Sequence, residues 1–200
     1  MTAANRPPPL PEKRMPSISL KIYMTPFAEK GATEDQKWSR DAANEALAVA
    51  NSIWSKANIA FVIADCVMDK PLEMAKSDRT DDRRLLDVLS LRHTPEKLVH
   101  LFLISPVQNL PAGGCSYLDS DPEPAGFVQW YGAGVANGRV WAHELGHLLS
   151  LDHVDVDYSD QRQAALRSNL MTRGLSVGTD LTAGQIGKAK SSKLINQFQS

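Results

Sequence analysis

The sequence predicts a mixed α/β (α+β) fold, because strand-like and helix-like segments alternate through the first three-quarters of the chain. Apolar residues with a period of two indicate a strand at residues 18–24. Apolar residues three and four positions apart indicate an amphipathic helix from Thr33 to about Lys56. The apolar run at 98–104 is typical of a central, buried strand. This order of elements favours a mixed sheet accompanied by helices.

Shorter elements complete the prediction. They are strands at 59–64, 115–118 and 127–131, a short helix within the loop at 68–97, and a helix at about 137–149. The last helix has a well-marked start, because Thr182 and Gln185 fit a capping box. Ile186, Ala189 and Leu194 give that helix an apolar face. The rest of the last quarter is expected to be irregular.

Length and composition indicate one globular domain. The chain has 200 residues, of which 42% are apolar and 22% charged, and this suffices to bury a core without disulfides. A formal net charge of -1 argues against a dedicated nucleic-acid binder. No apolar run reaches the roughly 20 residues of a membrane span, and two cysteines are too few for a disulfide scaffold. We expect a monomer.

The beginning of the chain is predicted to be a tail. Residues 1–16 hold five of the twelve prolines, which cannot donate backbone hydrogen bonds to a sheet or a helix interior. We therefore expect a flexible, proline-rich tail at 1–17 and a single domain at 18–200. The tail lacks the apolar core of a secretory signal. Either the protein does not use that export route, or the sequence is that of a mature or truncated form.

One short segment carries most of the chemical information. Residues 143–153 read HELGHLLSLDH and hold three of the five histidines. On a helix, His143 and His147 lie one turn apart on the same face, so both imidazoles can bind one metal ion. Glu144 lies about 100° around the helix, beside the metal rather than on it. That position suits a general base acting on metal-bound water.

His153 adds the most specific information. It follows His147 by six residues, which on a continuous helix would place it roughly 240° around the axis. For His153 to reach the same metal, the helix must end between the two residues and the chain must turn back. Three neutral imidazoles then leave one coordination position open to water, as in catalytic zinc sites. By contrast, His93 and His100 are interpreted as core histidines.

This segment resembles the signature of the metzincin clan of zinc endopeptidases, H-E-x-x-H-x-x-G-x-x-H followed by a methionine turn. Asn169-Leu170-Met171 resembles that turn and ends 18 residues after His153. Leu181-Thr182-x-x-Gln185 is similar to the closing helix of matrixin-like members. The resemblance implies a twisted mixed sheet above an active-site helix, with a cleft. It also implies an upper lobe at 18–153 that carries the zinc-binding helix, and a small, mostly irregular lower lobe at 154–200 with the Met-turn and one C-terminal helix.

The resemblance also implies roles for individual residues. His143, His147 and His153 would hold one catalytic Zn²⁺, Glu144 would be the catalytic base, and Met171 would form an apolar floor beneath the imidazoles. The short edge strand would pair with extended protein or peptide substrate. Its substrate-binding candidates are Gly114, Cys115, Ser116 and Tyr117. The implied activity is that of a zinc endopeptidase, and the family resemblance favours secretion.

Three positions depart from the family pattern. Ser150 replaces a glycine that is favoured where a helix ends with positive φ, and a serine in that conformation costs roughly 1–2 kcal/mol. Val154, after the third histidine, matches none of the subfamily markers, so the subfamily stays open. Arg173 stands where astacins and serralysins place an additional metal-binding tyrosine.

Alternative interpretations stay open at this point. A metzincin-like domain could keep its zinc and hold a protein partner in the cleft without proteolysis, although an intact Glu144 counts against this. The motif could also arise by chance in a fold without a metal. Cys115 could approach the zinc or pair with Cys66, but a small apolar role is favoured for such a cysteine.

Acidic residues raise the question of calcium. Neither of two acidic groups has EF-hand spacing, so we interpret them as solvated loop carboxylates rather than Ca²⁺ ligands. The groups are Asp119, Asp121 and Glu123, and Asp152, Asp155, Asp157 and Asp160. Asp152 or Asp155 could instead orient a ligand histidine.

Overall fold

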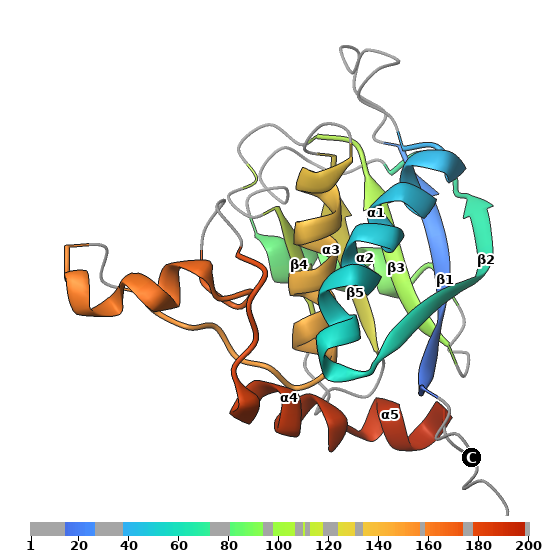
Figure 1. Cartoon of the computed structure of the whole chain (residues 1–200). Coiled ribbons are helices and arrows are strands. Elements are labelled where there is room, and N and C mark those ends of the chain that lie inside the picture. The colour runs from blue at the N-terminus through green and yellow to red at the C-terminus, as the bar shows by residue number, and fades with distance from the viewer. Residues whose placement is uncertain are drawn as a thin grey trace, which may run out of the picture.

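A five-stranded mixed sheet forms the centre of the protein (Figure 1). The computed structural model describes residues 15–26, 38–72, 81–93, 98–106, 110, 113–117, 124–130, 134–156, 159–173 and 178–198. The strands are β1 (Ser17–Thr25), β2 (Ala60–Met68), β3 (Val99–Ile104), β4 (Gly114–Ser116) and β5 (Ala125–Gln129), in the order β2-β1-β3-β5-β4. The pairings β2-β1, β1-β3 and β3-β5 are parallel, and β4 runs antiparallel to β5. The predicted mixed sheet is confirmed.

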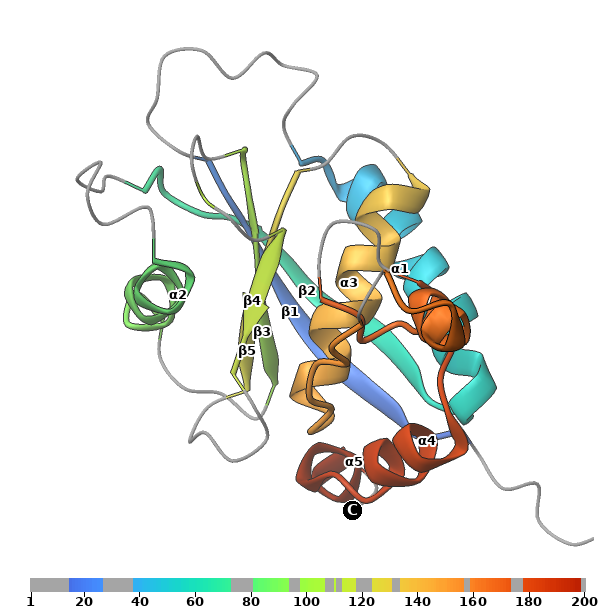
Figure 2. The same ribbon diagram turned by 90° about the vertical axis from the view of Figure 1, so that its left-hand side faces the viewer.

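Helices cover both faces of this sheet (Figure 2). The longer helices α1 (Arg40–Trp54) and α3 (Val135–Leu148) lie on one face, and α2 (Asp82–Ser90) lies on the other. Ser39 caps α1, since its hydroxyl accepts a hydrogen bond from the amide of Ala42 at 3.1 Å. The described helix therefore begins later than the predicted start at Thr33, which lies outside the described residues.

The C-terminal part contains two consecutive helices where one was predicted. They are α4 (Ala183–Lys190) and α5 (Lys193–Phe198), and both lie at the base of the molecule (Figure 1). The break falls at two serines, whose hydroxyls hydrogen-bond to backbone groups of the two helices. The hydroxyl of Ser191 bonds the carbonyl of Lys188 at 2.9 Å, and the hydroxyl of Ser192 accepts from the amide of Ile195 at 3.3 Å. A 3-10 helix at Gln161–Ser168 precedes this region.

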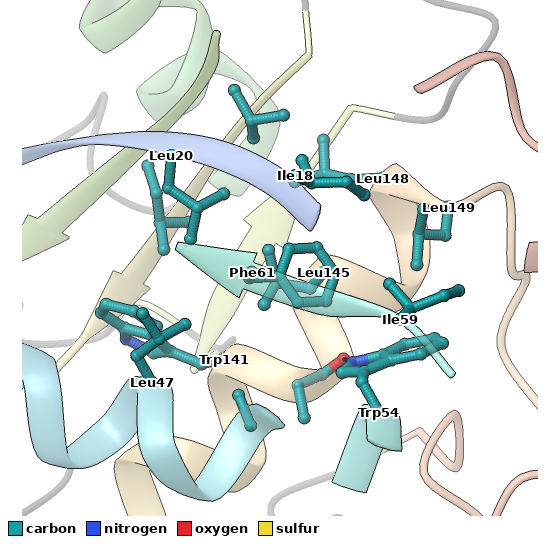
Figure 3. Close-up of a cluster of buried hydrophobic side chains, with 14 of the residues drawn as sticks. Ile18, Leu20, Leu47, Trp54, Ile59, Phe61, Trp141, Leu145, Leu148 and Leu149 are labelled. Carbon is teal, nitrogen blue, oxygen red and sulfur yellow. Dashed lines mark hydrogen bonds between the residues drawn. The ribbon is translucent and has the colours of Figure 1, made fainter. Parts of the chain in front are cut away.

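The main hydrophobic core lies between the sheet and the pair α1 and α3. Figure 3 shows Leu20 of β1, Phe61 of β2 and Leu145 of α3 packed together with Trp54 and Trp141. A smaller cluster fills the space between the sheet and α2 and includes Leu85, Leu86, Phe102 and Phe127. All six residues of β3 are buried, as predicted for a central strand.

Close packing of α1 against α3 fixes the position of the helix that carries the histidine motif. The indole N–H of Trp54 donates to the carbonyl of Ala142 at 3.0 Å, and both residues are fully buried. Gly138 allows the helices to approach, because a Cβ at this position would lie 2.4 Å from the Cβ of Val49. These contacts fix α3 against α1 on one face of the sheet.

Candidate metal centre

The helix α3 ends immediately after its second histidine, and the chain then reverses. The amide of Ser150 bonds the carbonyl of His147, and the amide of Leu151 bonds the carbonyl of Gly146, both at 2.9 Å. This pair of hydrogen bonds is the Schellman motif, which requires a left-handed residue at its turn. Ser150 occupies that position with φ 67°. The predicted turn back is confirmed, with a serine in the conformation that favours glycine.

The reversal brings the three histidines of the motif together. The Nε2 atoms of His143, His147 and His153 lie 3.2 Å from one another in all three pairs. His143 and His147 are buried, whereas His153 is exposed at the rim. Three or more His, Cys, Asp or Glu side chains can hold a metal ion together when their ligand atoms lie close to one another. Among the described residues, this triad is the group found with that arrangement.

Backbone carbonyls orient two of the imidazoles. The Nδ1 of His143 lies 2.7 Å from the carbonyl oxygen of Leu170, and the Nδ1 of His147 lies 2.7 Å from that of Leu151. Since a carbonyl can only accept, each Nδ1 carries the proton and each Nε2 presents its lone pair to the centre. Burial lowers the pKa of both histidines to about 4, and burial also lowers the pKa of His153.

The triad has the dimensions of a tetrahedral metal site. Lone pairs on neutral imidazoles repel one another at 3.2 Å unless a cation lies between them. Zinc–nitrogen bonds of about 2.0–2.1 Å with tetrahedral angles separate the nitrogen atoms by roughly 3.3 Å. The three histidines therefore fit a small divalent ion and leave one of its four positions for another ligand.

Glu144 lies beside the triad. Its side chain is 4% exposed, and its Oε2 accepts a hydrogen bond from the hydroxyl of Ser116 at 2.8 Å. Burial raises the pKa of Glu144 to about 8, and the hydrogen bond from Ser116 opposes that rise. A buried carboxyl of this kind can take up and hold a proton near neutral pH.

The two faces of β4 have different environments. Gly114 and Ser116 face Glu144, whereas Cys115 packs into the apolar cluster under α2. Tyr117 also turns to α2, where its hydroxyl donates to Asp87 at 2.5 Å. Of the four predicted substrate-binding residues, Gly114 and Ser116 thus lie on the face of β4 that contacts Glu144, and Cys115 and Tyr117 do not. Leu118, which the predicted strand included, lies outside the described residues.

Both cysteines are free thiols in the structure. Burial, together with the nearby Glu144 carboxylate, raises the pKa of the Cys115 thiol to about 12. Cys66 lies on β2 at the opposite edge of the sheet. This arrangement fits the interpretation of Cys115 as a small apolar side chain.

Met171 packs against the histidine helix from below. It is fully buried, and a Cβ on Gly146 would lie 2.5 Å from its Sδ atom. The side-chain oxygen of Asn169 accepts from the amide of Met171 at 2.9 Å, and the amide groups of Asn169 and Gln185 bond each other at 2.8 and 3.0 Å. The same segment provides the Leu170 carbonyl that orients His143. The sequence predicted Gln185 as a capping residue of the last helix, and the structure shows that it also bonds Asn169.

The acidic residues considered for calcium are placed in part. Asp152 accepts from the Nζ of Lys188 at 2.6 Å, and Asp155 lies 3.5 Å from the Nε of Arg173. Carbonyl groups, rather than these carboxylates, bond the Nδ1 atoms of His143 and His147. Residues 119, 121, 123 and 157 lie outside the described residues.

Across the part of the chain that the structure describes, no helix has the length and apolar character needed to cross a bilayer.

Comparison of whole structures identifies the fold. Mature mirolysin of Tannerella forsythia, solved in complex with a cleaved peptide, matches with a TM-score of 0.62 at 13% identity, over 92% of this chain and 95% of that one. Mirolysin in complex with compound 9 matches with a TM-score of 0.59 at 12% identity, over the same shares of the two chains. Metalloproteinase-II of Bacteroides fragilis matches with a TM-score of 0.55 at 14% identity, over 96% of this chain and 56% of that one. No protein-family profile and no curated protein sequence matches this chain. The fold is therefore metzincin-like.

Proposed function

We propose that the protein is a zinc-dependent endopeptidase, with His143, His147 and His153 as the zinc ligands and Glu144 as the catalytic base. The observation that carries this proposal is the triangle of Nε2 atoms at 3.2 Å, with a buried carboxyl beside it. Imidazole nitrogen is a preferred ligand of zinc, and three protein ligands with one open position are typical of catalytic sites. The metzincin-like fold supports the same conclusion.

The residues of this chain would divide the reaction between them. When bound, zinc supplies Lewis acidity and lowers the pKa of water at its open position. Glu144 accepts a proton from the attacking water and transfers it to the nitrogen of the leaving amine. Because Oε2 of Glu144 accepts a hydrogen bond from Ser116, we assign the proton to Oε1, which does not receive that bond.

We further propose that extended peptide pairs with β4 and that Met171 acts as the floor of the site. β4 is the last strand of the sheet in its described order, and a short edge strand offers backbone groups with little demand on sequence. Gly146 leaves room for the Met171 side chain directly below the histidine helix. We also propose that the protein is secreted, as the family resemblance implies.

The experiment compares Glu144→Gln with wild type in a fluorogenic-peptide or casein assay, with and without a chelator. General acid–base groups contribute about 10²- to 10⁴-fold, and we expect activity to fall by that factor while zinc content persists. The matched control is Glu45→Gln, which changes an exposed glutamate on α1 and should keep full activity. Undiminished hydrolysis by Glu144→Gln, or hydrolysis that a chelator does not affect, would contradict the proposal.

The same assay distinguishes an endopeptidase from the alternative, a zinc-binding domain that holds a protein partner without proteolysis. That alternative predicts stoichiometric zinc with no cleavage of any peptide in a proteome-derived library. Chelator-sensitive cleavage of library peptides, absent from Glu144→Gln, would exclude it and would also define the sequence preference.

A further inference from the structure

Two small residues on β4 lie against the carboxyl group of Glu144, and a third on β5 leaves room for one of them. A Cβ on Gly114 would lie 2.7 Å from the Cγ and 2.8 Å from the Oε1 of Glu144. Ser116, two residues further along the same strand face, donates its hydroxyl to Oε2 at 2.8 Å. Gly126 pairs with Ser116 across the strands, and a Cβ there would lie 2.4 Å from the Ser116 Oγ. The absence of side chains at both glycines creates the space that the serine and the carboxyl fill.

The serine determines which way the carboxyl group points. The terminal torsion of a glutamate is broad, so the plane of an unrestrained carboxyl rotates easily. A hydroxyl that donates to one oxygen fixes this plane, and hydrogen bonds to carboxylates are among the stronger ones. With Oε2 held by Ser116, Oε1 is the oxygen that does not receive this bond, and it lies next to Gly114, which has no side chain.

The strand that carries Ser116 is itself fixed from both sides. The amide of Tyr117 bonds the carbonyl of Ala125 at 2.9 Å, which continues the ladder between β4 and β5. On the α2 side, the Tyr117 hydroxyl donates to Asp87, and the guanidinium of Arg83 lies 4.1 Å from the centre of the tyrosine ring. Because these contacts fix β4, the hydroxyl of Ser116 holds the carboxyl group of Glu144 at a fixed position relative to the strand.

We infer that Ser116 is a positioning residue for Glu144, acting through the hydrogen bond between its hydroxyl and Oε2. This inference deepens the proposed function and rests on it. Because extended substrate would pair with the backbone of β4, loss of the Ser116 hydroxyl should lower kcat and leave KM nearly unchanged. The expected fall in kcat is about 10- to 100-fold, since one hydrogen bond to a charged group is lost.

The experiment compares Ser116→Ala, Ser116→Thr and the control Ser19→Ala in the zinc-loaded protein. Threonine keeps the hydroxyl and suits a strand, so we expect Ser116→Thr to recover most of kcat. Ser19 is also a half-buried strand serine, but it lies on β1, three positions from β4 in the sheet order. Its replacement should not change kcat or KM. A kcat of Ser116→Ala equal to wild type would overturn the inference.

A second measurement does not depend on activity. Thermal denaturation of wild type, Ser116→Ala, Glu144→Ala and the double variant forms a cycle that isolates the coupling of the two side chains. We expect Ser116→Ala to lower Tm by about 3–6 °C when Glu144 is present and by much less when it is replaced. Equal shifts in the two backgrounds would show that the bond does not form and would overturn the inference even in an active enzyme. Coupling without chelator-sensitive hydrolysis in wild type would instead overturn the proposed function, and with it any catalytic role of Ser116.

Discussion

Replacement of Ser150 tests whether the chain reverses through a left-handed residue after the histidine helix. Ser150→Gly and Ser150→Ala both remove the serine hydroxyl, so the difference between them isolates the backbone. A left-handed conformation costs a residue with a Cβ roughly 1–2 kcal/mol. Glycine loses about 0.5–1 kcal/mol more in backbone entropy on folding. We therefore expect Ser150→Gly to be more stable than Ser150→Ala by about 0.8 kcal/mol, which is about 2–3 °C in Tm for a chain of this size.

The assay is thermal denaturation of both variants at one fixed concentration of free zinc, because a bound metal adds to stability by mass action. Ala48, an exposed residue of α1, provides the matched comparison. There Ala48→Gly should cost about 1 kcal/mol, because the helical backbone favours alanine. Glycine should thus be the more stable residue at position 150, and alanine the more stable residue at position 48. If Ser150→Ala equals or exceeds Ser150→Gly in stability, the chain does not turn as described.

Three further perturbations have expected outcomes. Gly146→Ala places a methyl group 2.5 Å from the Sδ of Met171, so we expect denaturation to show a loss of about 1–3 kcal/mol despite the better helix propensity of alanine. Because burial raises the pKa of Cys115 to about 12, iodoacetamide at pH 8 should leave this thiol unmodified in the folded protein and label it in urea, as read by mass spectrometry. Burial lowers the pKa of His143 and His147 to about 4, so between pH 6.5 and 4 the unfolded chain binds more protons than the folded one. The raised pKa of Glu144 opposes this effect, so the histidines are tested in the Glu144→Gln variant. Urea midpoints of the chelated Glu144→Gln protein should be highest above pH 6.5 and fall as the pH drops toward 4.

Each of these outcomes has a control. Gly187→Ala on α4 meets no neighbouring atom within 4 Å and should gain about 1 kcal/mol, so a similar gain at Gly146 would mean that Met171 lies elsewhere. Rapid labelling of Cys115 in the folded protein would contradict its place in the cluster under α2. Replacing both histidines by asparagine in the Glu144→Gln protein should flatten the stability profile between pH 6.5 and 4, and an equally flat profile of Glu144→Gln alone would refute their burial in the neutral form.

Features encoded within a short stretch of sequence were predictable. The apolar run of β3, the helical periodicity of α1 and the capping box at Thr182 and Gln185 all depend on neighbouring residues, and the structure contains each of them. The histidine triad was predictable for the same reason, because its members fall within 11 residues and one helix turn fixes the first pair. The turn at Ser150 followed from the need to bring the third ring back.

Features that depend on strand register or on backbone atoms were not predictable. Which of Cys115 and Ser116 faces the metal centre depends on how β4 pairs with β5, and a shift of one residue would exchange them. The groups that orient His143 and His147 are carbonyls of two leucines, which no residue type reveals. The bond between Asn169 and Gln185 joins segments 16 positions apart, so neither residue alone indicates it.

X-ray absorption at the zinc edge, on protein loaded with one equivalent of zinc, tests the central claim most directly. We expect three imidazole nitrogen ligands and one oxygen ligand from water at about 2.0–2.1 Å, with one imidazole lost in His153→Ala. A sulfur ligand at about 2.3 Å, or a coordination shell unchanged in His153→Ala, would contradict the assignment of the three histidines.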